Sequence, residues 1–129
     1  MIKLIYCLRK RADISDEEFH RYWLHEHGPA VARFAKAIGG LRYVQSHTVA
    51  PALNEMFRAS RNLAAPFDGI TEVWYESAEY LLACAQTPQG KHAHEVLLED
   101  ERRFIDFENS CVFMSEEHEI FDFLAPTGA

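Results

Sequence analysis

Apolar and polar residues alternate in four short stretches of the chain, and longer stretches between them carry apolar residues every three or four positions. Alternation predicts β-strands, and the longer spacing predicts amphipathic helices. We expect strands at Ile2–Arg9, Leu41–Val49, Ile70–Tyr75 and Cys111–Met114, followed by a β-rich tail at Glu119–Phe123. With helical segments after the first and third strands, the order βαββαβ predicts a ferredoxin-like α+β fold. Such a fold is an antiparallel sheet with both helices on one face.

The first helical segment carries a start signal and a strong interruption. The capping box Ser15–Glu18 predicts that the helix begins at its serine. The Gly28-Pro29 pair lacks one backbone donor and favours a turn, so the helix should stop or kink near His27. His25 and His27 would then lie at a helix end, near a chain reversal. We expect His27 to be the one that faces inward.

The rest of the chain contains two further breaks. Thr87–Gly90 interrupts the second helical segment, which starts at the capping residue Ser77 and ends at Asn109-Ser110. The connection Pro51–Pro66 is long, and a short helix at Leu53–Ser60 could lie over the surface. This connection would suit a lid over a pocket, although an exposed connection of this length needs no function.

The composition favours one domain and argues against two classes of partner. With 129 residues, 48% of them hydrophobic, the chain can bury a single core, so we expect one domain over residues 1–129. A formal charge of -7 argues against nucleic acid or an anionic membrane, because both require clustered Lys and Arg. The three cysteines lack metal-ligand spacing, no signal peptide is evident, and no apolar run approaches the ~20 residues that span a bilayer. These features predict a cytoplasmic protein.

A sheet with helices on one face leaves its other face open, and here that face is not uniformly polar. Both faces of the first two strands carry apolar side chains, and the apolar segment 120–124 has no partner in a monomer. A homodimer that packs two sheets face to face and exchanges the tails would bury both surfaces. We therefore expect a homodimer.

A set of motifs runs along nearly the whole chain. The motifs are Met1–Tyr6, Phe19–Trp23 leading into His27-Gly28-Pro29, Asp68–Trp74, Thr87-Pro88, Asp100-Glu101 and Phe104–Asp106. Together they resemble the EthD-like family of the dimeric α/β-barrel superfamily. The resemblance implies a dimer whose two sheets form a barrel, with a pocket in each subunit between sheet and helices. It does not imply one reaction, since similar proteins include lactone isomerases, polyketide dehydratases and cyclases, and cofactor-free monooxygenases.

The second strand places Tyr43, Gln45 and His47 on one face, because side chains alternate along a strand. Such a row of hydrogen-bonding groups is unusual for a core. In a pocket, Tyr43 and His47 would polarise a carbonyl or stabilise an enolate, and Gln45 would contact the substrate. The alternative is a solvent-exposed face at the edge of the sheet.

The third strand places Glu72 between Ile70 and Trp74 on one face. A carboxylate there is costly unless it is paired or protonated, and its pKa should rise if no cation reaches it. We expect His27 or His25 as its partner. The pair would serve either in acid–base catalysis or as a structural bond that holds the helix on the sheet.

Three aromatic side chains, Tyr22, Trp23 and Trp74, could contact an aromatic ligand, although tryptophan in such positions more often belongs to the core. His25-x-His27 and His92-x-His94 do not indicate a metal, because residues two apart on a helix point to different faces. No glycine pattern for nucleotide binding occurs. We therefore expect neither a metal nor another cofactor.

The residues together favour a cofactor-free enzyme that binds a small apolar, cyclic or aromatic molecule, such as a polyketide-like compound. It would move protons in dehydration, isomerisation or cyclisation. His27, or His25 if the kink turns the helix, would be the general base, tuned by Glu72. The alternatives are a cofactor-independent monooxygenase, in which the deprotonated substrate reduces oxygen, and a non-catalytic ligand-binding accessory protein of a degradation pathway.

Overall fold

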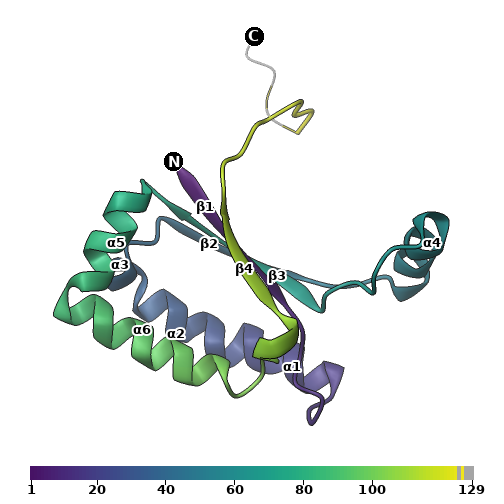
Figure 1. Ribbon diagram of the computed structural model, residues 1–129, viewed down its shortest axis with the longest axis horizontal. Coiled ribbons are helices and arrows are strands. Elements are labelled where there is room, and N and C mark those ends of the chain that lie inside the picture. Colours follow the sequence, from purple (N-terminus) through teal and green to yellow (C-terminus); the bar gives the residue numbers. More distant parts are fainter. Residues whose placement is uncertain (125, 127–129) are drawn as a thin grey trace.

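A computed structural model describes residues 1–124 and 126 of the chain (Figure 1). Its strands are β1 (Ile2–Leu8), β2 (Arg42–His47), β3 (Gly69–Tyr75) and β4 (Cys111–Ser115). Its α-helices are α1 (Asp16–Tyr22), α2 (Gly28–Arg33), α3 (Ala35–Ile38), α4 (Pro51–Arg61), α5 (Ala78–Gln86) and α6 (Pro88–Glu101). A π-helical turn, η1 (Trp23–His27), joins α1 to α2, and a short 3-10 helix, η2 (Phe107–Asn109), precedes β4.

The described strands form one antiparallel sheet of four strands in the order β2-β3-β1-β4. Near the middle of β1, Leu4 pairs with Val73 on one side and with Met114 on the other. The helices α1, α2, α5 and α6 lie on one side of this sheet (Figure 1). The arrangement confirms the predicted ferredoxin-like α+β fold.

Two predicted helix boundaries are confirmed by their capping hydrogen bonds. Ser15 Oγ accepts a hydrogen bond from Glu18 N at 3.1 Å, which forms the start of α1. Thr87 Oγ1 accepts one from Gly90 N at 2.9 Å, at the predicted interruption between α5 and α6. Both residues therefore act as N-caps, Ser15 as its capping box predicts and Thr87 at the predicted interruption.

The predicted interruption of the helix near His27 takes the form of the π-turn η1, which ends at His27 before α2 begins with Pro29 in its first turn, whereas the predicted chain reversal is wrong. The backbone at Gly28 remains helical, with φ -52° and ψ -53°, and continues into α2. The Gly28 N–H donates to the carbonyl of Trp23, five residues earlier, which is the hydrogen bond of a π-turn. The wider turn accommodates the ring of Pro29, which the interior of an α-helix would not.

Among the described residues, buried apolar side chains form two clusters between the sheet and the helices. The first contains Leu8, Phe19, Trp23, Phe104 and Ile105, and the second contains Val31, Ile38, Ala93 and Leu97. The helix α6 ends at Glu101 rather than at the predicted Asn109-Ser110, because Phe104 and Ile105 leave the helix to enter the first cluster. The core therefore surrounds η1 and the end of α6.

The helix-free face of the sheet carries both charged and apolar side chains. The Lys3 ammonium lies 2.6 Å from a carboxylate oxygen of Glu72 and 3.6 Å from one of Glu117. The register places Ile5 and Phe113 beside each other on this face. Phe113 is half exposed, so the monomer leaves apolar surface here uncovered.

Two segments project from the body (Figure 1). We call α4 the arm; it is longer than the predicted helix Leu53–Ser60. We call residues 116–124, which follow β4, the tail. The predicted β-rich stretch Glu119–Phe123 makes no strand pairing within the described residues, because the tail leads away from the sheet.

In the described part of the chain, no helix is both long and apolar enough to cross a membrane.

Candidate functional site

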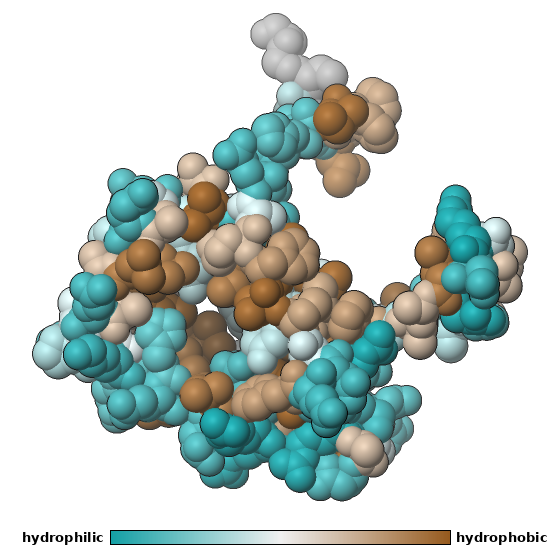
Figure 2. Space-filling model, in the orientation of Figure 1, coloured by the Kyte–Doolittle hydropathy of each residue, from teal (hydrophilic) through white to brown (hydrophobic). Residues whose placement is uncertain are grey.

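A cavity of about 420 Å³ lies between the sheet and the helices that cover it. Its walls are mainly apolar and include Leu4, Trp23, Val31, Leu97 and Phe104, and its polar groups include Tyr6, His27, Tyr43, Thr71, His94 and Glu101. Apolar side chains are visible inside a hollow of the body (Figure 2). Such a volume, mostly apolar with a few polar groups, is typical of a small-molecule site. Among the described residues, none of the arm lines it, so the arm does not serve as its lid in this structure.

The π-turn η1 points His27 into this cavity, where its side chain is 6% exposed. His27 Nδ1 lies 2.6 Å from Oδ2 of Asp100 on α6. The Asp100 carboxylate accepts the Nδ1–H, so the neutral ring keeps its lone pair on Nε2. Among the described residues, nothing hydrogen-bonds Nε2. The ring is therefore oriented as a general base would be.

Burial and Asp100 have opposite effects on the pKa of His27. Burial lowers this pKa below its ordinary value of 6.5, and the neighbouring carboxylate partly offsets the effect. The lowered pKa keeps the imidazole neutral at pH 7. A neutral imidazole can accept a proton from a substrate.

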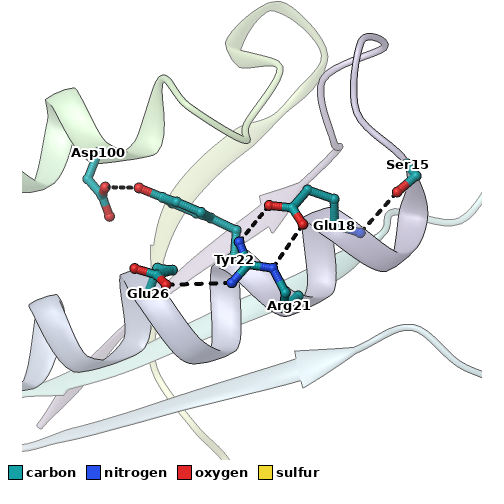
Figure 3. A network of polar contacts seen from close by, with 6 residues as sticks. All are labelled: Ser15, Glu18, Arg21, Tyr22, Glu26 and Asp100. Carbon is teal, nitrogen blue, oxygen red and sulfur yellow. Dashed lines mark hydrogen bonds and ion pairs between the residues drawn. The ribbon is translucent and has the colours of Figure 1, made fainter.

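Asp100 is held by Tyr22, beside a separate network of polar contacts on the same helical segment (Figure 3). Tyr22 extends from α1 and its hydroxyl donates to Oδ1 of Asp100, the oxygen that His27 does not use. The preceding residue, Arg21, donates to Glu18 at 2.8 Å and lies 3.5 Å from Glu26. These contacts order the outer face of the helix that carries Tyr22, and the phenol in turn orients the carboxylate.

Glu101, the next residue on α6, lines the cavity itself. Burial raises the pKa of its carboxyl group, the neighbouring Asp100 raises it further, and an interaction with the Tyr6 hydroxyl partly offsets these effects. Burial and Glu101 together raise the pKa of Tyr6. The carboxyl group therefore retains a proton at higher pH than an exposed glutamate does.

On β2, the predicted row of polar side chains is confirmed as one hydrogen-bonded chain. Gln45 Nε2 donates to the Tyr43 hydroxyl and to the Trp23 carbonyl, both at 2.8 Å. Gln45 Oε1 lies 2.7 Å from His47 Nε2, and His47 Nδ1 lies 2.7 Å from His20 Nδ1. Because the amide nitrogen is used twice as a donor, Oε1 must accept from His47. Of this chain, Tyr43 alone among the described side chains lines the cavity.

The Tyr43 hydroxyl accepts a hydrogen bond from Gln45, so its own proton remains available. Burial raises the pKa of Tyr43, which keeps that proton in place. The indole N–H of Trp23 is buried beside the Tyr43 hydroxyl, and within the described residues it makes no hydrogen bond of normal geometry. The Tyr43 hydroxyl belongs to the cavity wall, and a buried donor is costly without a partner. A ligand oxygen would supply one.

Glu72 and Trp74 lie on the opposite face of the sheet. The side chains of Thr71 and Val73 face the cavity, so period-two alternation turns Glu72 and Trp74 away from it. Glu72 pairs with Lys3 at 2.6 Å. The predicted pairing of Glu72 with a histidine is therefore wrong, because the strand register determines which face it occupies.

The other predicted site residues divide into three groups. His27, Trp23 and Tyr43 line the cavity, whereas His25 is exposed on the outer side of η1. The remaining three lie one shell further out: Tyr22 on Asp100, and Gln45 and His47 behind Tyr43. His47 packs on the Trp23 ring at 4.2 Å between centroids, so it does not itself reach the cavity.

Three site residues were missed as catalytic candidates: Tyr6, Asp100 and Glu101. One sequence signal could have found Glu101, since it follows Leu97 by four residues and so occupies the apolar stripe of its helix. A carboxyl group in an apolar stripe needs an explanation. Asp100 carries no such signal, because its role depends on η1 lying beside α6.

Among the described residues, no group of three or more His, Cys, Asp or Glu side chains is arranged to hold a metal ion.

The free energy of unfolding should fall as the pH is lowered below about 6.5. Burial lowers the pKa values of His27 and His47 in the folded chain below 6.5, their ordinary value in the unfolded chain. At pH values between the folded-state pKa and 6.5, the unfolded chain therefore binds more protons than the folded chain does. The stability that the neutral rings contribute is thus complete above pH 6.5 and is lost on acidification. Urea titrations from pH 7.5 to 5.0 should show the advantage of the wild type over His47→Gln narrowing with falling pH. A constant difference would contradict the expected protonation behaviour.

The strand order and the helices on one face of the sheet define this chain as a ferredoxin-like α+β protein. The model of the EthD domain matches residues 11–108, and the chain therefore belongs to the EthD family. This confirms the resemblance of its motifs. No curated protein matches the chain.

Solved structures share the fold at low sequence identity. An EthD family protein from Bacillus halodurans C-125 is 19% identical, with a TM-score of 0.60 over 92% of this chain and 99% of that one. A dimeric ferredoxin-like protein of unknown function from Thermobifida fusca YX is 11% identical, with a TM-score of 0.54 over 88% of each chain. SnoaB, a cofactor-independent oxygenase from Streptomyces nogalater, is 10% identical, with a TM-score of 0.51 over 92% of this chain and 93% of its own.

Proposed function

We propose that this protein is a cofactor-free enzyme that moves protons in a small, neutral, cyclic ketone. The observation that carries the proposal is the His27–Asp100 pair at the wall of a mainly apolar cavity. A histidine oriented by a carboxylate and kept neutral by burial is suited to remove a proton from carbon next to a carbonyl group.

The enolate formed in this way needs hydrogen-bond donors at its oxygen. We assign this role to the Tyr43 hydroxyl, which lies in the cavity wall. Donors that are already in position stabilise developing negative charge without reorganisation. In this proposal Gln45 and His47 position Tyr43 rather than touch the substrate.

Glu101 would act as the acid. In a β-hydroxy ketone, His27 Nε2 takes the α-proton, the electron pair forms the new C=C bond, and the C–O bond to the hydroxyl breaks. The Glu101 proton joins the leaving oxygen, so water is released. The proton on His27 then returns to the Glu101 carboxylate through solvent, which restores both groups. Of dehydration, isomerisation and cyclisation, this acid–base pair favours dehydration.

The charges of the site support a neutral substrate. Among the described lining residues there is no Lys or Arg, and Glu101 adds acidic character. A carboxylate or phosphate on the ligand would be desolvated without a cation. Uncharged cyclic ketones avoid that cost and bury their rings against the apolar wall.

A pair of related compounds tests the proposal. We expect the protein to exchange the α-hydrogens of 1-tetralone in deuterium oxide, and to convert 3-hydroxy-1-tetralone to 1-naphthol and water. Proton NMR follows the first reaction and absorbance the second. Oxygen uptake coupled to substrate loss would favour the monooxygenase alternative, and binding without either reaction would favour the accessory protein.

Glu101→Gln should slow dehydration of 3-hydroxy-1-tetralone by about 10²–10⁴-fold, because the amide has no acidic proton to give. Deuterium exchange into 1-tetralone needs only the base and should be largely retained. The turnover numbers of the two reactions are the measurement. Glu99→Gln, an exposed position on the same helix, should alter neither. Equal loss in both reactions would show that Glu101 is not the acid.

We also propose that the protein forms a homodimer through the helix-free face of its sheet. The half-exposed Phe113 and its neighbour Ile5 leave apolar surface there, and exposed apolar residues follow in the tail. Packing of two such sheets face to face would bury this surface.

A further inference from the structure

The arm and the tail expose more large apolar side chains than isolated surface positions explain. On the arm, Leu53, Met56 and Phe57 are 50–69% exposed. On the tail, Ile120, Phe121, Phe123 and Leu124 are 72–96% exposed. Contiguous exposed apolar surface marks an interaction site. Both segments therefore need a partner.

The arm in particular lacks support from its own chain. It has 11 residues, and helices this short are marginal in water without tertiary packing. Its ends are Ala50 and Asn62, which both have left-handed backbone conformations. For Ala50 this conformation is unfavourable and requires surrounding structure to maintain it. A surface packed against the arm would provide that structure.

The two segments are complementary in charge. The arm carries two arginines, Arg58 and Arg61, and one glutamate, Glu55, which bonds Arg58 at 2.5 Å. The tail contains Glu116, Glu117, Glu119 and Asp122 and no Lys or Arg. The tail is therefore both apolar and acidic, and the surface complementary to it is apolar and basic. The arm is such a surface.

The two segments of one chain do not meet. They project from different ends of the sheet and lie apart, with open space between them (Figure 1). Brown, apolar surface is visible on the body-facing side of the arm and on the tail (Figure 2). Contact between an arm and a tail therefore requires a second copy. A two-fold axis would form the contact twice, since each copy supplies one arm and one tail.

We propose that the tail of each protomer packs along the apolar face of the partner's α4, with Glu119 directed toward Arg61. This contact rests on the homodimer proposed above and adds to the sheet face a second, reciprocal interface. It gives the arm its tertiary partner and buries the apolar residues of the tail.

Sedimentation velocity on the full chain at micromolar concentration tests the contact. Phe57→Glu should weaken the dimer on the order of 100-fold, as the loss of a buried aromatic anchor does. Arg61→Glu and Glu119→Arg should each weaken it by about threefold to tenfold, and the double variant should recover most of the loss. Circular dichroism melts of the monomeric fraction should be unchanged, because none of these residues belongs to the core.

Two results would overturn the arm and tail contact. One is a wild type that is monomeric. The other is a dimer that none of these substitutions weakens, which would leave the sheet face as the whole interface. Deuterium exchange into 1-tetralone distinguishes this failure from failure of the proposed function, since it depends on His27 and not on the arm.

Discussion

His27→Ala should lower the turnover number for deuterium exchange into 1-tetralone by about 10²–10⁴-fold, the usual contribution of a positioned general base. The expectation depends on three features of the site. His27 is buried at the cavity wall, its Nδ1 is bonded to Asp100 at 2.6 Å, and burial lowers its pKa so that it is neutral at pH 7. Without the ring, the cavity holds no other neutral imidazole oriented by a carboxylate within the described residues.

The matched control is His25→Ala. His25 belongs to the same π-turn but is exposed, so its loss should leave the rate unchanged. The pH profile adds a second check, since the rate should fall on acidification through the lowered pKa of His27. A His27→Ala protein that folds and retains the full rate would remove the residue from the mechanism.

Gly90→Ala should destabilise the protein by about 3 kcal/mol or more, as severe overpacking does. A Cβ at position 90 would lie 1.8 Å from the carbonyl oxygen of Cys84 and 2.8 Å from its carbonyl carbon. These are backbone atoms, so relief requires α5 and α6 to separate. The shift would also disturb Asp100 at the far end of α6. Urea unfolding at pH 7.5 measures the effect.

Gly28→Ala is the matched control for this substitution. Its Cβ would meet the Gln45 side-chain nitrogen at 3.3 Å and the Trp23 carbonyl oxygen at 3.5 Å, and its backbone is already helical. Alanine there should change the stability by no more than about 1 kcal/mol, because the lower entropy of the unfolded chain offsets the tight contact with the hydrogen-bonded Gln45 amide. Similar losses of unfolding free energy in Gly28→Ala and Gly90→Ala would show that the close contact between α5 and α6 at Gly90 is not the cause.

The order of elements and their caps could be predicted because they depend on local pattern. Ser15 and Ser77 accept the expected capping hydrogen bonds, and the polar row on β2 shares one face. The failed predictions concern residues for which local chemistry permits two outcomes. Gly28-Pro29 can end an α-helix or follow a π-turn, and the choice depends on what Trp23 packs against.

By itself, the sequence determined the βαββαβ fold, membership of the EthD family and the inward position of His27. Hydrophobic period and capping chemistry are properties of neighbouring residues, so they can be read along one segment. Only the tertiary structure determined which carboxylate hydrogen-bonds His27. The register of β3 turned Glu72 toward Lys3, and the packing of α6 on η1 brought Asp100 to His27 across 73 positions. Such pairing depends on how separate segments meet, which no local pattern encodes.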